Sequence, residues 1–217
     1  MTDLGTMYRG ARARIGDLVV GLDAAGSATA VPCCPGWSVR DVVAHLAGTT
    51  DDVLAGKLTG PPTDEQTAQQ VARFADRSVA DVFAHWDAQA PEFESLVTSF
   101  EVWPAVIDAL THEHDIRGAI DRPGNRDSDD VHRAASAALG LLAPPVPVIL
   151  RFEDEERRFG PEQGDAVTLE TNWFETLRWR LGRRSRSQLA ALAWSRPPGD
   201  IVDHLVIFGP SPLDIVE

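Results

Sequence analysis

Apolar residues recur at three- and four-residue spacing along most of residues 3–142, which is the period of an amphipathic α-helix. The break "TGPPTD" (59–64) is followed by a weaker helical pattern, and Pro91 lies inside a strong one, where it is expected to bend or split the helix. The main helices are predicted over residues 3–23, 39–58, 78–97, 101–120 and 128–142.

The start of the second main helix is well marked. In "GWSVRDVV", the hydroxyl of Ser38 can cap the backbone amides of a new helix, and Asp41 lies in its first turn, where a negative charge is favourable. This start places His45 two turns into the helix, beside its apolar stripe.

The pattern changes to a two-residue period after "APPVP" (143–147). The stretch "VPVILRFEDEERRFG" predicts two short strands around an acidic turn, and "DAVTLE" predicts a third. Two helices are then expected in "NWFETLRWRLG" and "SRSQLAALAW", whereas "IVDHLVIFGP" fits a strand or a short helix. The predicted fold class is α+β, with a four-helix bundle in residues 1–143 and a small α+β domain in residues 144–217.

Composition narrows the classes of partner. The formal net charge of −13 argues against nucleic acid and anionic membranes, and favours a small-molecule partner. There is no run of eighteen apolar residues, so we expect a cytoplasmic protein. We expect it to be a monomer or a homodimer. Cys33 and Cys34 are adjacent and are expected to be reduced thiols near a turn, because a disulfide between neighbours would be strained.

The stretch "DALTHEHDIRGAI" (108–120) concentrates two histidines and three acids in an otherwise apolar helix. Asp108 and His112 are four residues apart and share one face, whereas His114 points elsewhere. The groups are compatible with a solvated helix end, a satisfied polar network, or half of a metal site. If the second and fourth main helices are neighbours, His45 can join the pair, and two imidazoles with one carboxylate suit zinc or the ferrous iron of oxygenases.

Three stretches resemble a known family: "VPCCPGWSVRDVVAHLAG" (31–48), "DALTHEHDIRGAIDRPGNRD" (108–127) and "NWFETLRWRLGRRSRSQLAALAW" (172–194). Together they are similar to the actinobacterial mycothiol-dependent maleylpyruvate isomerase-like proteins. This resemblance implies a DinB-like four-helix bundle followed by a sterol-carrier-like C-terminal domain. It also implies an enzyme that uses the small thiol mycothiol as cosubstrate and acts on a small electrophilic substrate, as an isomerase or a thiol S-transferase.

The resemblance also implies metal ligands. In the family, a histidine after the Gly-Trp-Ser/Thr turn binds the metal, and this position is His45 here. The other ligands are usually a glutamate and a histidine four residues later, which correspond to Asp108 and His112. A zinc-bound thiol loses its proton at neutral pH and becomes a nucleophile. In the isomerase, this thiolate adds to a cis double bond, the adduct rotates about the new single bond, and elimination gives the trans isomer.

Two features leave alternatives open. Asp108 is one methylene shorter than the glutamate of the family, which favours the alternative of a non-catalytic small-ligand-binding protein with a degenerate metal site. A carboxylate-bearing substrate would need cations, and Arg183 and Arg184 are the candidates for anion contact in an arginine-rich stretch that also contains Arg178, Arg180 and Arg186. The same arginines can instead complement the C-terminal end of their helix.

Overall fold

The computed structural model describes residues 3–58 and 60–217; of the predicted break at 59–64, Thr59 lies outside the described residues. By their contacts, these residues divide into two compact units. The first extends to Gly124 and includes Glu217, and the second comprises Asn125–Val216. No helix in the described part of the chain is long and apolar enough to span a membrane.

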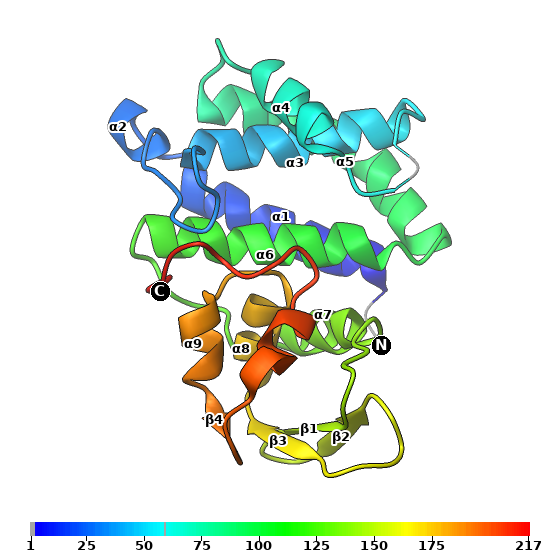
Figure 1. Ribbon diagram of the computed structural model, residues 1–217. Coiled ribbons are helices and arrows are strands. Elements are labelled where there is room, and N and C mark those ends of the chain that lie inside the picture. Colours follow the sequence, from blue (N-terminus) through cyan, green and yellow to red (C-terminus); the bar gives the residue numbers. More distant parts are fainter. Residues whose placement is uncertain (1–2, 59) are drawn as a thin grey trace. The chain divides into compact units, whose positions relative to one another are not determined.

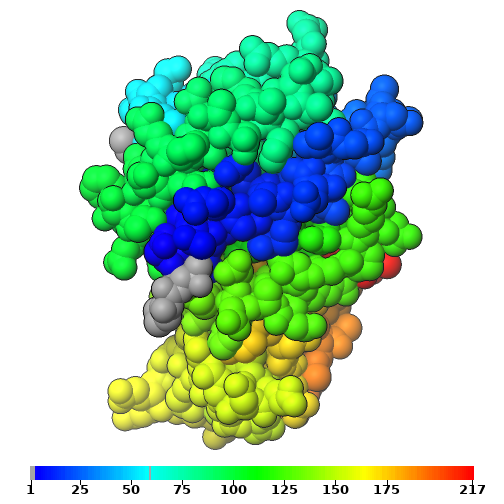
Figure 2. Space-filling model, turned by 180° about the vertical axis from the view of Figure 1, so that it is seen from behind, coloured from blue at the N-terminus to red at the C-terminus, as the bar shows by residue number. Residues whose placement is uncertain are grey.

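The first unit is a helical bundle (Figure 1). Helix α1 packs against α5 and α6, and α3 packs against α4, α5 and α6. Figure 2 shows α1, in dark blue, with the residues of α5 along one side. The helices of the described residues in this unit are α1 (Leu4–Val19), α2 (Ala24–Ser27), α3 (Val39–Leu54), α4 (Asp64–Ala72), α5 (Val79–Ser99) and α6 (Trp103–Ala119).

Helix starts follow the predicted capping chemistry. The side chain of Ser38 accepts a hydrogen bond from the backbone N–H of Asp41, and the Asp41 carboxylate accepts one from the backbone N–H of Ser38. This reciprocal pair satisfies two amide groups that the first turn leaves free. Of the two effects expected at Pro91, a bend or a split, the split does not occur, since α5 continues through Pro91 with Trp86 and Phe93 buried on either side.

The second unit combines helices with a small sheet. Strand β1 (Val148–Arg151) pairs antiparallel with β2 (Glu156–Phe159) and parallel with β3 (Val167–Glu170), and β3 pairs antiparallel with β4 (Ala193–Trp194). The order is therefore β2-β1-β3-β4. The remaining elements are α7 (Asp129–Leu139), α8 (Trp173–Arg180), α9 (Arg186–Ala190) and a 3-10 helix, η1 (Gly199–His204). The α+β class is confirmed.

The hydrophobic core of the second unit is formed by its strands and helices. Leu150 and Leu169, paired in neighbouring strands, are fully buried together with Trp179 of α8. Helix α7 packs against α8. Contacts therefore place α7 in the second unit, whereas the periodicity placed it with the bundle, because the period reports the helix but not its neighbours.

One predicted helix is shorter than expected. The stretch "SRSQLAALAW" is helical only over Arg186–Ala190, because Ala193 and Trp194 pair with Glu170 and Leu169 of β3. In the tail, for which strand and helix were both open, Ile201–His204 belong to the 3-10 helix η1, and the residues that follow are irregular.

Candidate metal centre

Three side chains from two helices converge in the first unit. Nε2 of His45, on α3, lies 3.6 Å from one carboxylate oxygen of Asp108, on α6. Nε2 of His112 lies 3.5 Å from the other oxygen. One ligand atom from each of the three residues lies within 4.8 Å of the other two. The structure therefore brings together the three residues that the sequence singled out.

The Nδ1 atom of His45 is held by an amide side chain. It lies 3.0 Å from Oε1 of Gln70, on α4. The amide orientation is fixed, because Nε2 of Gln70 donates to Asp52, whose other oxygen accepts from Arg73. Since Oε1 can only accept, Nδ1 of His45 carries the proton in the neutral ring, and the lone pair is on Nε2, toward Asp108.

Gly48 permits this approach of α4 to α3. A Cβ atom added to Gly48 would lie 2.6 Å from Cβ of Gln70, closer than packed carbon atoms can be. The absence of a side chain at this position therefore allows Gln70 to reach His45.

The Nδ1 atom of His112 is held by a carboxylate. It lies 2.9 Å from Oδ2 of Asp115, whose side chain is fully buried. As an acceptor-only carboxylate, Asp115 places the proton of the neutral ring on Nδ1 and leaves Nε2 as the lone pair. Both imidazoles thus present Nε2 to Asp108, in the tautomer that allows each to bind a metal through Nε2.

The geometry fits a small divalent cation. Zinc ligands at 2.0–2.2 Å in a tetrahedral arrangement are separated by about 3.4 Å, and the two nitrogen to oxygen separations are 3.5 and 3.6 Å. The shorter side chain of Asp108 is therefore long enough to lie at ligand distance from both rings. The two histidine side chains are nearly buried, whereas that of Asp108 is 38% exposed, so the carboxylate is the solvent-facing member.

Trp37 lies beside both imidazoles. Its ring centroid is 5.1 Å from that of His45 and 6.2 Å from that of His112, and the two imidazole centroids are 5.3 Å apart. An apolar ring next to the cluster lowers the local dielectric constant and strengthens the attraction between a cation and the Asp108 carboxylate.

The other histidines lie outside the cluster. His114 is buried on α6 but contributes no atom to the group around Asp108. His85 pairs with Asp51 at 2.9 Å, and His132 stacks on Trp173. His204 lies exposed in η1. His85 and His132 therefore make contacts outside the cluster, and His204 faces solvent.

The arginine-rich stretch of the second unit is largely engaged within that unit. Arg184 contacts both carboxylate oxygens of Glu175, at 2.6 and 2.7 Å. Arg183 donates to the carbonyl oxygen of Leu181 at 2.7 Å. Arg180 donates to carbonyl oxygens, and its burial lowers its pKa. Arg186 pairs with two aspartates. Anion contact by Arg183 and Arg184 stays a prediction.

Sequence reasoning missed Gln70 and Asp115, which orient the two imidazoles. A signal for Asp115 was present, because it follows His112 by three residues and so shares its helix face. Gln70 gave no such signal, because it reaches His45 from a different helix through tertiary packing.

Tyr8 has a buried hydroxyl group in the same unit, and the hydrogen bonds of this group indicate a structural role. Trp86 donates to its oxygen, Tyr8 donates to Thr50, and Thr50 donates to the carbonyl oxygen of Leu46. Burial raises the pKa of Tyr8 well above its usual value, and the negative charge of Asp108 contributes in the same direction. The phenol therefore stays protonated at neutral pH.

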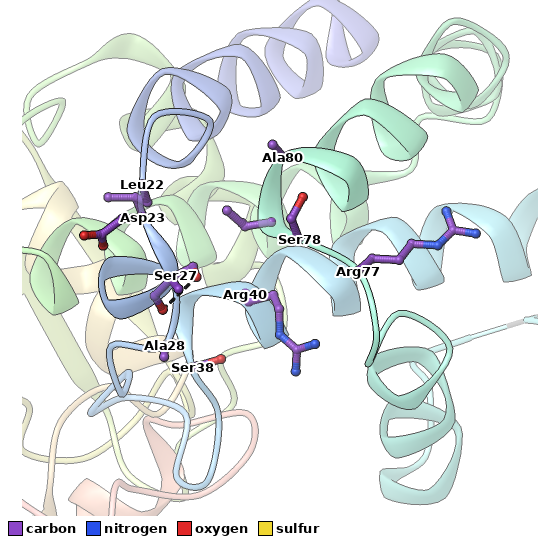
Figure 3. A pocket seen from close by; sticks show the side chains of 11 residues that line it. Leu22, Asp23, Ser27, Ala28, Ser38, Arg40, Arg77, Ser78 and Ala80 are labelled. Carbon is purple, nitrogen blue, oxygen red and sulfur yellow. Dashed lines mark hydrogen bonds between the residues drawn. The ribbon is translucent and has the colours of Figure 1, made fainter.

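A separate pocket opens where α3 and α5 begin, lined by residues that include Leu22, Asp23, Ser38, Arg40 and Arg77. Figure 3 shows the guanidinium groups of Arg40 and Arg77 extending to one side, away from Leu22 and Asp23. Arg40 is bound to the Asp41 carboxylate, and the Ser38 hydroxyl serves as a helix cap. None of the lining residues belongs to the cluster around Asp108.

Comparison with known proteins points to one family. Residues 8–77 match the family model of the mycothiol maleylpyruvate isomerase N-terminal domain. A crystal structure of the mycothiol-dependent maleylpyruvate isomerase is similar with a TM-score of 0.56 and 15% identity, and that of a single-site mutant with a TM-score of 0.60 and 14% identity. In both comparisons, 91% of this chain and 97% of the other are covered.

Among curated proteins, no sequence matches the chain. The low identity to the solved structures means that they establish the fold, whereas the family model carries the sequence relationship. The resemblance to the mycothiol-dependent maleylpyruvate isomerase-like family is therefore confirmed, by the family model for residues 8–77 and by solved structures for the α+β fold.

Proposed function

We propose that the first unit is a zinc-binding domain whose ligands are His45, Asp108 and His112. The observation that carries the proposal is the orientation of the two imidazoles: each Nδ1 is held by an acceptor, and each Nε2 lies near a different oxygen of Asp108. Three protein ligands leave one tetrahedral position for an exogenous group, as catalytic zinc sites do. The exposed side of Asp108 gives that group an approach from solvent.

We further propose that the exogenous group is the thiol of mycothiol, and that the protein is an isomerase or a thiol S-transferase. When bound, zinc would lower the pKa of this thiol and supply a thiolate at neutral pH. The family model and the solved isomerases support the choice of thiol. The residues of this chain would hold the site rigid, since Gln70 and Asp115 fix the rings and Trp37 flanks them.

The substrate we propose is a small electrophile, carboxylate-bearing, with Arg183 and Arg184 contacting its anionic part. The two arginines differ in what they can offer. The fork of Arg184 is bound through Nε and Nη2 to Glu175, so an anion would have to share it. Arg183 donates to a carbonyl oxygen, and its guanidinium is a planar cation of the kind that binds carboxylates.

The test is an assay of zinc-loaded protein with mycothiol and maleylpyruvate, followed by detection of the trans isomer. We expect isomerisation that requires both zinc and mycothiol, and that is lost in His45→Ala but retained in His114→Ala, a buried histidine outside the cluster. If the protein binds zinc and mycothiol but does not isomerise maleylpyruvate, it would instead be a thiol S-transferase or act on a different electrophile. Absence of both zinc and mycothiol binding would favour the non-catalytic small-ligand-binding protein.

A further inference from the structure

A second group of metal-ligating side chains lies behind the ring of His112, on the side of its Nδ1 atom. The thiol of Cys34 lies 3.5 Å from Oδ2 of Asp115, and the thiol of Cys33 lies 3.6 Å from Oε1 of Glu217. The ligand atoms of Cys33, Asp115 and Glu217 all lie within 4.8 Å of one another. Asp115 is therefore shared by two neighbouring groups, one with Cys33 and Glu217 and the other with Cys34 and His112.

We propose that Cys33, Cys34, Asp115 and Glu217 form a second site, for zinc or another thiophilic divalent cation. Tetrahedral zinc with sulfur ligands at 2.3 Å and oxygen ligands at 2.0–2.2 Å separates sulfur from oxygen by about 3.5 Å. The two sulfur to oxygen distances, 3.5 and 3.6 Å, already match this value. Cation binding would replace the two thiol protons that now point to the carboxylates, so two protons would be released for each cation bound.

The backbone around the cysteines is fixed in a way that suits a site. The N–H of Val31 donates to the carbonyl oxygen of Trp37, the N–H of Cys34 to that of Val31, and the N–H of Trp37 to that of Cys34. Both cysteines therefore lie in a hydrogen-bonded turn that precedes α3. Asp115 lies on α6 with a fully buried side chain, so the carboxylate is placed rigidly as well.

The second site does not compete with the first for His112. Nδ1 of His112 keeps its proton and donates it to Oδ2 of Asp115, and the Asp115 carboxylate also lies in the group with Cys33 and Glu217. A histidine that binds one cation through Nε2 and donates Nδ1–H to a carboxylate is the usual outer-shell arrangement of metal sites. The second site is therefore independent of whether the first one supports catalysis.

Cobalt(II) is the probe, because a thiolate bound to cobalt gives a near-ultraviolet charge-transfer absorption that imidazole and carboxylate ligands do not give. We expect reduced, metal-free protein to develop this absorption on addition of Co2+, and each of Cys33→Ser and Cys34→Ser to lose about half of it. Serine keeps a hydroxyl donor at each position, so the fold is expected to be retained, which circular dichroism checks. Glu217→Gln should weaken cobalt binding at the thiols.

His45→Ala separates the two sites, since it removes a ligand of the first and none of the second. We expect His45→Ala to retain the full thiolate absorption. If the parent shows none, the thiols are hydrogen-bond donors only and the proposal is overturned. The proposal is also overturned if His45→Ala abolishes the absorption, or if Glu217→Gln binds cobalt at the thiols as tightly as the parent.

Discussion

Nδ1 of His45 and Oε1 of Gln70 lie 3.0 Å apart, so the orientation of an imidazole on α3 is set by an amide on α4. Gln70 is itself fully buried and is fixed by the pair formed by Asp52 and Arg73. The orientation of His45 thus depends on Gln70, and that of Gln70 on Asp52 and Arg73. Gln70 is therefore a positioning residue.

Gln70→Ala should lower zinc affinity by about 10- to 100-fold, the usual cost of losing an outer-shell partner. The reason is that the His45 ring loses the acceptor that fixes its tautomer. Zinc affinity, measured by competition with a chromophoric chelator, checks this prediction. Gln69→Ala, at the preceding exposed position, is the matched control and should bind zinc as the parent does. A Gln70→Ala protein that is less stable but binds zinc with unchanged affinity would contradict the positioning role.

Asp108→Glu should bind zinc at least as tightly as the parent. The aspartate oxygens already lie 3.5 and 3.6 Å from the two Nε2 atoms, and a longer side chain gives the carboxylate more freedom to reach the cation. Asp108→Ala should weaken binding by more than about 100-fold, because losing a direct ligand costs more than losing an outer-shell partner. Equal zinc affinity of parent and Asp108→Ala in the same competition assay would remove Asp108 from the ligand set.

Arg183→Ala and Arg184→Ala should have different effects. Arg184→Ala removes the two-point contact with Glu175 and should destabilise the protein by about 1.5–3 kcal/mol, the range for hydrogen bonds to charged groups. Arg183→Ala should raise KM for a carboxylate substrate by about tenfold or more. Unchanged KM in both variants would leave the stretch with a purely structural role.

The Asp3 carboxylate is expected to make the stability of the fold depend on pH. Its carboxylate accepts hydrogen bonds from the backbone N–H of Thr6 and from the hydroxyls of Thr6 and Thr98, which together lower its pKa to about 2. A lowered pKa in the folded state contributes stability that is complete above the ordinary pKa of about 3.9 and is lost as the pH falls toward 2. Asp3→Asn should therefore melt at a lower temperature than the parent at pH 5, and the difference should shrink between pH 4 and pH 2. A constant difference across that range would contradict the linkage.

The sequence was informative about the site where ligands share a helix or follow a marked helix start. Asp108 and His112 are one turn apart, and the capping box at Ser38 fixes the register that places His45 on the inner side of α3. Helical spacing within one helix was sufficient to predict these positions. That α3 and α6 are neighbours could only be assumed from the sequence, because periodicity identifies a buried face but not the helix that covers it.

The remaining features depend on packing between elements. Gln70 reaches His45 because Gly48 lacks a side chain, and the residue pattern of a single helix cannot predict a contact between two helices. Pairing with β3 likewise ends the helix after Ala190, against the helical pattern of the residues that follow. Cys33 and Cys34 read as ordinary thiols in sequence, since Asp115 and Glu217 approach them only in the folded chain.

The central claim is that His45, Asp108 and His112 bind one cation together, and zinc content tests it most directly. Parent, His45→Ala and His114→Ala proteins, purified without an affinity tag, would be dialysed against the same free zinc concentration and analysed for bound metal. We predict that the parent and His114→Ala hold equal amounts, and that His45→Ala holds one equivalent less while remaining folded. Equal zinc content in the parent and His45→Ala would contradict the account.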